Sequence, residues 1–225
     1  MGAVLDVIFD LFYPPKCMLC GRLVESSEER VCRECLLSDL PEYEGSDPDV
    51  PYYAKAVATF WYKEPITDAI RRYKFHGMDV YAEQFAAWMA VTIRDKLADR
   101  YDVISWAPCS WQRAWSRGYD QSELLARQLS KELNIEFLRT LRKVKHTPKQ
   151  SRTSSAAKRR ANVLGVYRPY EPERFAGKRI LMIDDVLTTG ATLSECGKVL
   201  QMAGAGELVC AVLASAHKDQ GDHNK

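Results

Sequence analysis

A short apolar run that ends in two adjacent carboxylates constrains the fold of this chain more than any other feature of its sequence. Ile180–Ile183 is apolar throughout, Asp184 and Asp185 follow directly, and a turn rich in threonine then leads into a segment with helical periodicity. Short, fully apolar runs are typical of strands that a parallel sheet buries on both faces. In open sheets of this kind, ligands bind beyond the carboxyl ends of the strands. The pattern therefore predicts a buried strand that ends beside a ligand site.

The chemistry of the turn indicates which ligand it can bind. Backbone N–H groups at the start of a helix can hold a phosphate, and the hydroxyls of Thr188, Thr189 and Thr192 can add to them. The two carboxylates suit the hydroxyls of a ribose, or a Mg²⁺ ion that bridges to them. Together these groups predict a ribose 5-phosphate. The alternative is a buried strand followed by a capped helix, but unpaired carboxylates at that strand end would be costly to desolvate.

Four of the seven cysteines form two C-x-x-C pairs. Cys17 and Cys20 are the first pair, and Cys32 and Cys35 follow after eleven intervening residues. This spacing predicts a zinc site of the structural kind, because four thiolates leave no open coordination position. Disulfides are the alternative, and no secretion signal favours them. Residues 1–15 lack a basic start and a cleavage site and have the spacing of a short amphipathic helix.

Strand-like and helix-like segments alternate along the rest of the chain. Such alternation is typical of an α/β domain with a mainly parallel sheet and helices on both faces. Strands are predicted at 54–62, 102–107, 135–138, 179–183 and 208–213, and helices at 65–73, 81–97, 120–133 and 192–202.

We expect two structured parts and a short tail. An N-terminal helix and a zinc-ribbon-like module occupy 1–45, the α/β domain occupies 52–218, and a polar tail follows at 219–225. The segment 41–51 is polar and contains proline, which is typical of a linker. No apolar run approaches the roughly 18 residues that span a bilayer. We therefore expect no membrane span and a cytoplasmic location.

The net charge of +2 is distributed unevenly along the chain. Residues 1–50 are acidic overall, whereas 137–170 contains many Arg and Lys residues and no Asp or Glu. An asymmetry of this size indicates an anionic partner. The alternative is an ordinary solvated loop. Because 139–162 shows no long apolar period, it is predicted to be a long loop with at most a helical turn.

The segment Ile180–Thr192 resembles the phosphoribosyl pyrophosphate (PRPP) motif of type I phosphoribosyltransferases, in which apolar residues precede two acids and a Thr/Gly loop. The resemblance implies a type I phosphoribosyltransferase-like fold with Mg²⁺ and PRPP as ligands. It assigns Asp184 and Asp185 to the ribose hydroxyls and to catalysis. It assigns the loop around the 5-phosphate to Val186, Leu187, Thr188, Thr189, Gly190, Ala191 and Thr192.

Further stretches narrow the resemblance to the ComF family of competence proteins. The stretches Tyr73–Gly77, Arg117–Gln121 and Thr147–Gln150 occur in family order between the cysteine module and the PRPP motif. Members are implicated in DNA uptake during natural transformation, which implies single-stranded DNA and a helicase of the uptake machinery as partners. One position departs from the family pattern, because Asp120 stands where the family usually has Asn. A hydrogen bond that needs an amide donor is therefore in doubt at this position.

The same resemblance assigns roles to two further loops. The loop after the first core strand receives the pyrophosphate in type I transferases, here a role for Arg113 and Arg117. Trp111 and Trp115 alternate with these arginines and either stack on bases or pack against the zinc module. The basic loop, residues 139–162, corresponds to the mobile catalytic loop of the transferases, with one of its arginines in catalysis. The cations of this loop bind either pyrophosphate or the phosphates of single-stranded DNA. They are Lys149, Arg152 (the catalytic candidate), Lys158, Arg159 and Arg160.

Two classes of function follow from these patterns. In the first, a nitrogen nucleophile attacks C1 of Mg²⁺-PRPP in nucleotide or nitrogen-base metabolism. In the second, the fold keeps PRPP binding within a protein that handles DNA. Purine-salvage transferases often carry a general-base carboxylate where this chain has Thr188, which disfavours base salvage. We therefore expect the DNA-uptake role with PRPP binding, and the sequence leaves catalysis open.

Overall fold

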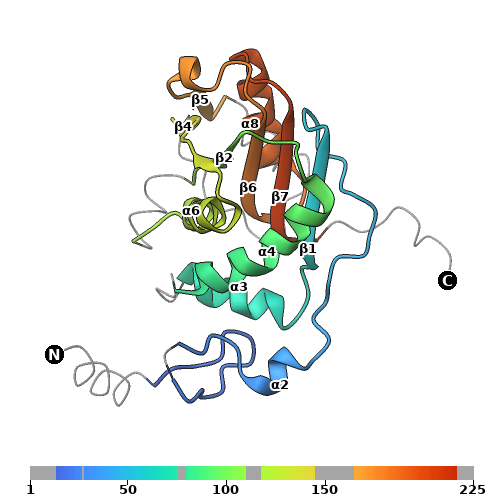
Figure 1. Ribbon diagram of the computed structural model, residues 1–225, viewed down its shortest axis with the longest axis vertical. Helices are drawn as coiled ribbons and strands as arrows, with labels where there is room; N and C mark the ends of the chain where they lie inside the picture. Colours follow the sequence, from blue (N-terminus) through green and yellow to red (C-terminus); the bar gives the residue numbers. More distant parts are fainter. Residues whose placement is uncertain (1–13, 27, 76–79, 110–117, 145–164, 217–225) are drawn as a thin grey trace.

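A five-stranded parallel sheet organises the chain (Figure 1). The computed structural model describes residues 14–26, 28–75, 80–109, 118–144 and 165–216. Every neighbouring pair of strands in this sheet is parallel, which confirms the predicted α/β class. In spatial order the strands are β1 (Lys55–Trp61), β7 (Leu208–Ser215), β6 (Ile180–Leu187), β2 (Val103–Trp106) and β3 (Glu136–Phe137).

Helices cover both faces of the sheet. Alternate residues of a strand point to opposite faces, and β6 shows this clearly. Leu181 and Ile183 join the core formed with α4 and α6, whereas Ile180 and Met182 join the core beneath α8. The helix α3 lies beside α4 on the first face (Figure 1). The bounds are Ile66–Phe75 for α3, Tyr81–Leu97 for α4, Gln121–Leu133 for α6 and Ala191–Met202 for α8.

The central strand β6 is longer than the sequence predicts. The prediction ends the strand at Ile183, but β6 continues through both acids to Leu187. The reason is its neighbour, because β7 offers backbone partners as far as Ser215 and the ladder pairs Leu187 with that residue. The two acids therefore lie within the last part of a paired strand.

One short strand, β4 (Leu141–Lys143), corrects the prediction that 139–162 is a loop with at most a helical turn. It pairs antiparallel with β5 (Tyr167–Pro169). Leu141 and Tyr167 are both buried in the core on the α8 side, which holds the pair against the sheet. Strands of three residues are too short to show a period, so the sequence gives no signal for them. A 3₁₀ turn at Pro172–Arg174 follows.

The cysteine module packs directly on the α/β domain. Met18 and Leu19, which lie between the first two cysteines, are buried in the same core cluster as Tyr73 of α3 and Tyr81 of α4. The short helix α2 (Arg33–Leu36) carries the last of the four cysteines. The first cysteine pair is therefore continuous with the main core.

The segment predicted as a linker, 41–51, lies against β1. The Tyr43 ring is buried, and its centroid lies 4.3 Å from that of the Trp61 ring. The backbone N–H of Trp61 donates to the carbonyl of Pro41 across 2.7 Å. Val50 is also buried. Sequence composition indicates polarity here, but these two contacts and the burial of Val50 anchor the segment. Within the described part of the chain, no helix is long and apolar enough to cross a membrane.

Candidate functional site

A pocket of about 190 Å³ lies at the carboxyl ends of β2 and β6. Parallel strands bring their carboxyl ends to one edge of the sheet, so the residues that follow β2 meet the acids of β6 there. The starts of α6 and α8, the end of α3, and the short strands β4 and β5 form the rest of the wall. The lining residues are Lys74, Ala107, Pro108, Cys109, Asp120, Gln121, Ser122, Lys143, Tyr167, Asp184, Asp185, Val186 and Thr192.

Each of the two acids of β6 has a side-chain partner from a different helix. The Ser122 hydroxyl of α6 donates to Asp184 Oδ1 across 2.9 Å, and the Asp185 N–H donates to the same oxygen across 2.9 Å. Lys74 Nζ of α3 lies 2.8 Å from Asp185 Oδ2, and these two side chains are only 20% and 15% exposed. The acid pair is therefore held by α3 and α6 at the same time.

The pKa of Asp184, the first acid of the pair, is raised. Burial raises the pKa of Asp184 to about 7, and the neighbouring charge of Asp185 acts in the same direction. The hydrogen bonds from Asp185 and Ser122 and the charge of Lys74 oppose this shift. Near neutral pH the Asp184 carboxyl can therefore take up or release a proton, and a bound cation would favour the ionised form.

The start of α6 is organised by Asp120. One carboxylate oxygen accepts the N–H groups of Ser122 and Glu123, and the other accepts the N–H of Cys109 across 2.7 Å. Asp120 is therefore a helix N-cap that also holds the loop after β2. Residue 120 is the acceptor in all three hydrogen bonds. A carboxylate can therefore make them, and no amide donor is needed at this position. Burial raises the pKa of Asp120 as well.

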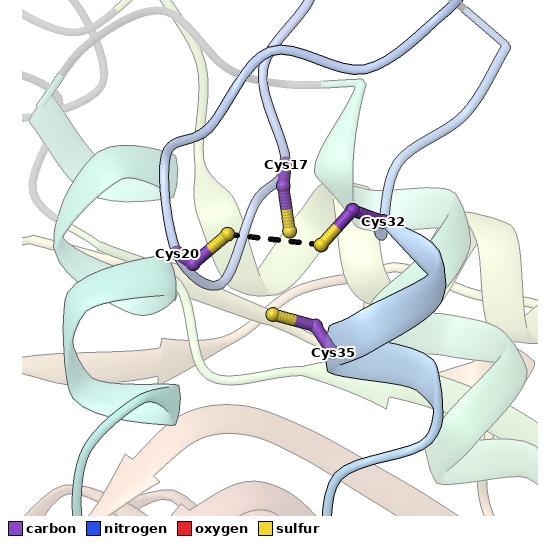
Figure 2. A group of neighbouring side chains, drawn as sticks. All are labelled: Cys17, Cys20, Cys32 and Cys35. Atoms are coloured by element: carbon purple, nitrogen blue, oxygen red, sulfur yellow. Dashed lines mark hydrogen bonds between the residues drawn. The ribbon is translucent and has the colours of Figure 1, made fainter.

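The four predicted metal-ligating cysteines come together in one cluster. Their sulfur atoms all lie within 4.8 Å of one another, and Figure 2 shows them converging from Cys17, Cys20, Cys32 and Cys35. The Cys20 and Cys32 sulfurs are 3.8 Å apart, far beyond the roughly 2.05 Å of a disulfide, and all four cysteines are free. These sulfurs could hold one metal ion.

Comparison with known proteins shows the family to which the chain belongs. A family model for the phosphoribosyl transferase domain matches residues 120–225. Competence protein F of Haemophilus influenzae is 31% identical to this chain over 208 residues, which cover 90% of this chain and 85% of that protein. The chain belongs to the ComF family of competence proteins. The DNA utilization protein YhgH of Escherichia coli O157:H7 is 26% identical over 203 residues, covering 84% of this chain and 85% of that protein.

Among solved structures, adenine phosphoribosyltransferase from Thermoanaerobacter pseudethanolicus matches with a TM-score of 0.41 and 14% identity. The match covers 75% of this chain and 95% of that one. The family model, together with the parallel sheet and the helices on both of its faces, confirms the type I phosphoribosyltransferase-like fold expected from the PRPP-motif resemblance.

Only part of the segment that resembles a PRPP motif, Ile180–Thr192, lines the pocket. Val186 and Thr192 line it together with the two acids, whereas Leu187 is buried at the end of β6. The turn formed by Thr188 and Thr189 leads to Gly190, whose φ of +68° is the left-handed conformation that glycine adopts readily. Ala191 then begins α8, one residue before the predicted start. Thr188, Thr189, Gly190 and Ala191 are not part of the lining of this pocket.

Several candidate residues lie outside the described residues. These are the pyrophosphate and stacking candidates Trp111, Arg113, Trp115 and Arg117, and the basic-loop candidates Lys149, Arg152, Lys158, Arg159 and Arg160. Their assigned roles stay predictions. Within the described part of 139–162, Lys143 does reach the pocket, and Tyr167 of β5 lines it as well.

Sequence reasoning missed several pocket residues. Ser122 carries no motif signal of its own, because its partner Asp184 is 62 positions away. Lys143 lies with its Nζ 5.3 Å from the centroid of the Tyr167 ring, and the pairing of β4 with β5 brings these two residues together. Lys74 had a signal, because it lies within the Tyr73–Gly77 stretch shared with the ComF family.

Proposed function

We propose that this ComF family protein binds Mg²⁺-PRPP, or a related ribose 5-phosphate, in the acid-pair pocket and acts in DNA uptake. The observation that carries the proposal is the placement of Asp184 and Asp185 in one pocket with Thr192 of the first turn of α8. Carboxylates suit ribose hydroxyls or Mg²⁺, and the N-terminus of a helix favours a phosphate. One pocket thus offers both kinds of group that a ribose 5-phosphate needs.

Calorimetric titration of Mg²⁺-PRPP into the wild-type protein tests the proposal. The double variant Asp184→Asn with Asp185→Asn should lose the binding heat, because amides cannot supply the negative charge that Mg²⁺ requires. Asp102→Asn is a suitable control, since Asp102 pairs with Arg179 at the amino ends of β2 and β6, away from the pocket at their carboxyl ends. Binding that is unchanged in the double variant would place the ligand elsewhere and refute this site.

The DNA part of the proposal rests on charge and on relatives. Two relatives carry names that refer to competence and to DNA utilization. The stretch 137–170 has no acidic residue, and its described cations Arg139, Arg142, Lys143 and Arg168 lie on or beside β4 and β5. We propose that single-stranded DNA phosphates bind along this basic stretch, next to the PRPP pocket.

Catalysis is the second candidate, and the match to a phosphoribosyl transferase domain favours it. Transfer would break the bond between C1 of PRPP and its pyrophosphate while a nitrogen nucleophile forms the new bond to C1. Release of pyrophosphate on addition of a nitrogen base to the PRPP-bound protein would establish this activity. Binding of PRPP without release, whichever base is added, would restrict the protein to the binding role.

We further propose that the four-cysteine cluster binds a structural Zn²⁺ ion. Tetrahedral zinc with sulfur ligands at about 2.3 Å requires sulfurs about 3.8 Å apart, which is the separation of the Cys20 and Cys32 sulfurs. Four thiolates fill the coordination sphere, so the ion would stabilise the module and take no part in chemistry.

A further inference from the structure

Three consecutive residues at the end of α3 contact three separate parts of the molecule. Arg72 reaches the cysteine module, Tyr73 reaches the start of α6, and Lys74 reaches the acid pair of β6. Neighbouring residues on a helix point in different directions, and residues two apart do not share a face. The last turn of α3 therefore lies between the cysteine module and the ligand pocket and contacts both.

The contact with the cysteine module is specific. Arg72 Nη1 donates to the carbonyl oxygens of Met18 and Leu19 across 2.8 and 2.9 Å. These two residues lie between Cys17 and Cys20, and both are buried. The guanidinium also lies against Gly21, where an added Cβ would be 3.4 Å from Arg72 Nη2. Hydrogen bonds from a charged donor to two carbonyls of one turn define the position of that donor closely.

The middle residue fastens α3 to α6. Tyr73 is fully buried, and its hydroxyl donates to the carbonyl of Gln121 across 2.8 Å. Tyr119 in turn donates its hydroxyl hydrogen to the carbonyl of Tyr73. The end of α3 is therefore fixed to the first turn of α6, the same turn in which Ser122 holds Asp184.

The third residue acts on the pocket itself. Lys74 Nζ lies 2.8 Å from Asp185 Oδ2, and both side chains are largely shielded from solvent. A PRPP-like ligand is a polyanion, and two adjacent carboxylates repel it unless a cation compensates their charge. The position of Lys74 therefore bears on how strongly the pocket binds such a ligand, and a rigid helix turn links that position to Arg72.

We propose that the cysteine module positions the ligand pocket through Arg72, Tyr73 and Lys74. In this arrangement Arg72 is a positioning residue, which acts on the ligand only through Lys74, while Tyr73 fixes the end of α3 to the start of α6. The inference rests on the proposed PRPP site for its ligand, and adds to it a role for the cysteine module in the affinity of the pocket. A module that served only the stability of its own segment would leave that affinity unchanged.

The test is a double-mutant cycle on ligand affinity. Arg72→Ala and Lys74→Met should each weaken Mg²⁺-PRPP binding in calorimetry by about tenfold, the equivalent of about 1.4 kcal/mol. If Arg72 acts through Lys74, the double variant should bind no more weakly than Lys74→Met alone. Arg72→Lys, which keeps the charge, should recover part of the loss.

Arg71→Ala is the matched control. Arg71 precedes Arg72 on α3 but faces solvent, where it pairs with Asp68 and Glu64. Its removal should leave the affinity within about twofold of wild type, as is usual for surface changes. Circular dichroism and metal content measured on each variant exclude unfolding as the cause of any loss. Affinity in Arg72→Ala equal to that of Arg71→Ala, or additive losses in the double variant, would overturn the coupling.

A second readout does not depend on the ligand. Amide hydrogen exchange of the last turn of α3 should be faster in Arg72→Ala than in Arg71→Ala, because the anchor to Met18 and Leu19 is lost. If wild-type protein fails to bind PRPP, the proposed function falls, and exchange alone decides the coupling. Equal exchange in the two variants would then reject it.

Discussion

Ser122 of α6 donates its hydroxyl hydrogen to Asp184 of β6 across 2.9 Å. This bond joins the first turn of a helix to the carboxyl end of the central strand. On the same turn, Asp120 accepts the N–H of Ser122 and the N–H of Cys109 from the loop after β2. Two strand ends and one helix start are thus connected around the acid pair, and this connection can be tested one residue at a time.

Ser122→Ala should weaken Mg²⁺-PRPP binding by about tenfold, since a hydrogen bond to a charged group contributes roughly 1.5–3 kcal/mol. Without the hydroxyl, the Asp184 carboxylate loses the side-chain bond that orients it toward the pocket. Calorimetry measures the affinity. Ser130→Ala is the control, because Ser130 lies near the other end of α6 and donates to the carbonyl of Ile135. Equal affinities in the two variants would show that Asp184 needs no orienting bond.

The stability of the wild-type protein should decline as the pH rises, and Asp184→Asn should remove this decline. Burial raises the pKa of Asp184 from its ordinary 3.8 to about 7 in the folded protein. Between these values the folded protein binds more protons than the unfolded chain, so the free energy of unfolding falls as pH rises. It stays lower above pH 7, and each unit of pKa difference is worth about 1.4 kcal/mol. Asparagine has no charge to bury, so the free energy of unfolding of the variant should not show this decline.

Denaturant unfolding at several pH values between 4 and 8, without Mg²⁺, measures the effect on the wild type and on Asp184→Asn. Ser130→Ala is the control, because it removes a hydrogen bond to the carbonyl of Ile135 and alters no carboxyl group, so it should keep the wild-type pH dependence. A decline of the same size in Asp184→Asn would mean that the buried carboxyl does not cause it.

Purified protein should contain about one zinc per chain, as a single four-thiolate site requires. Cys20→Ser should lower both the zinc content and the melting temperature, because Met18 and Leu19 of the same turn belong to the main core. Elemental analysis and calorimetric unfolding give the two values. Cys109→Ser should keep its zinc, since Cys109 is not in the cluster. Full zinc content in Cys20→Ser would exclude this residue as a ligand.

Removal of Arg159 and Arg160 should weaken binding to single-stranded DNA and flatten its salt dependence. Each phosphate contact contributes about 0.7 to the slope of log K against log salt for single strands. Loss of two contacts should therefore reduce the slope by about 1.4. Fluorescence anisotropy over a range of salt concentrations measures both quantities. Arg94→Ala is the control, because Arg94 of α4 donates to the carbonyl of Glu132 of α6, outside the basic stretch 137–170. Slopes that agree in both variants would remove the basic loop from the DNA site.

The sequence by itself determines the features that depend on neighbouring residues. The apolar run before Asp184 indicates a strand buried on both faces, and the spacing of the four cysteines indicates a metal site. Apolar side chains at every fourth position from Tyr81 to Leu97 indicate a helix. Each of these is a local pattern, because strand and helix periods and tight turns involve residues only a few positions apart.

Only the tertiary structure decides which distant residues meet. Lys74 and Asp185 are more than a hundred positions apart, and they meet because α3 packs where β6 ends. The extension of β6 to Leu187 depends on the length of β7, and the position of segment 41–51 depends on its contacts with β1. No local pattern encodes such contacts. They arise because a parallel sheet brings strand ends together from separate parts of the chain and because burial then selects the helices that cover them.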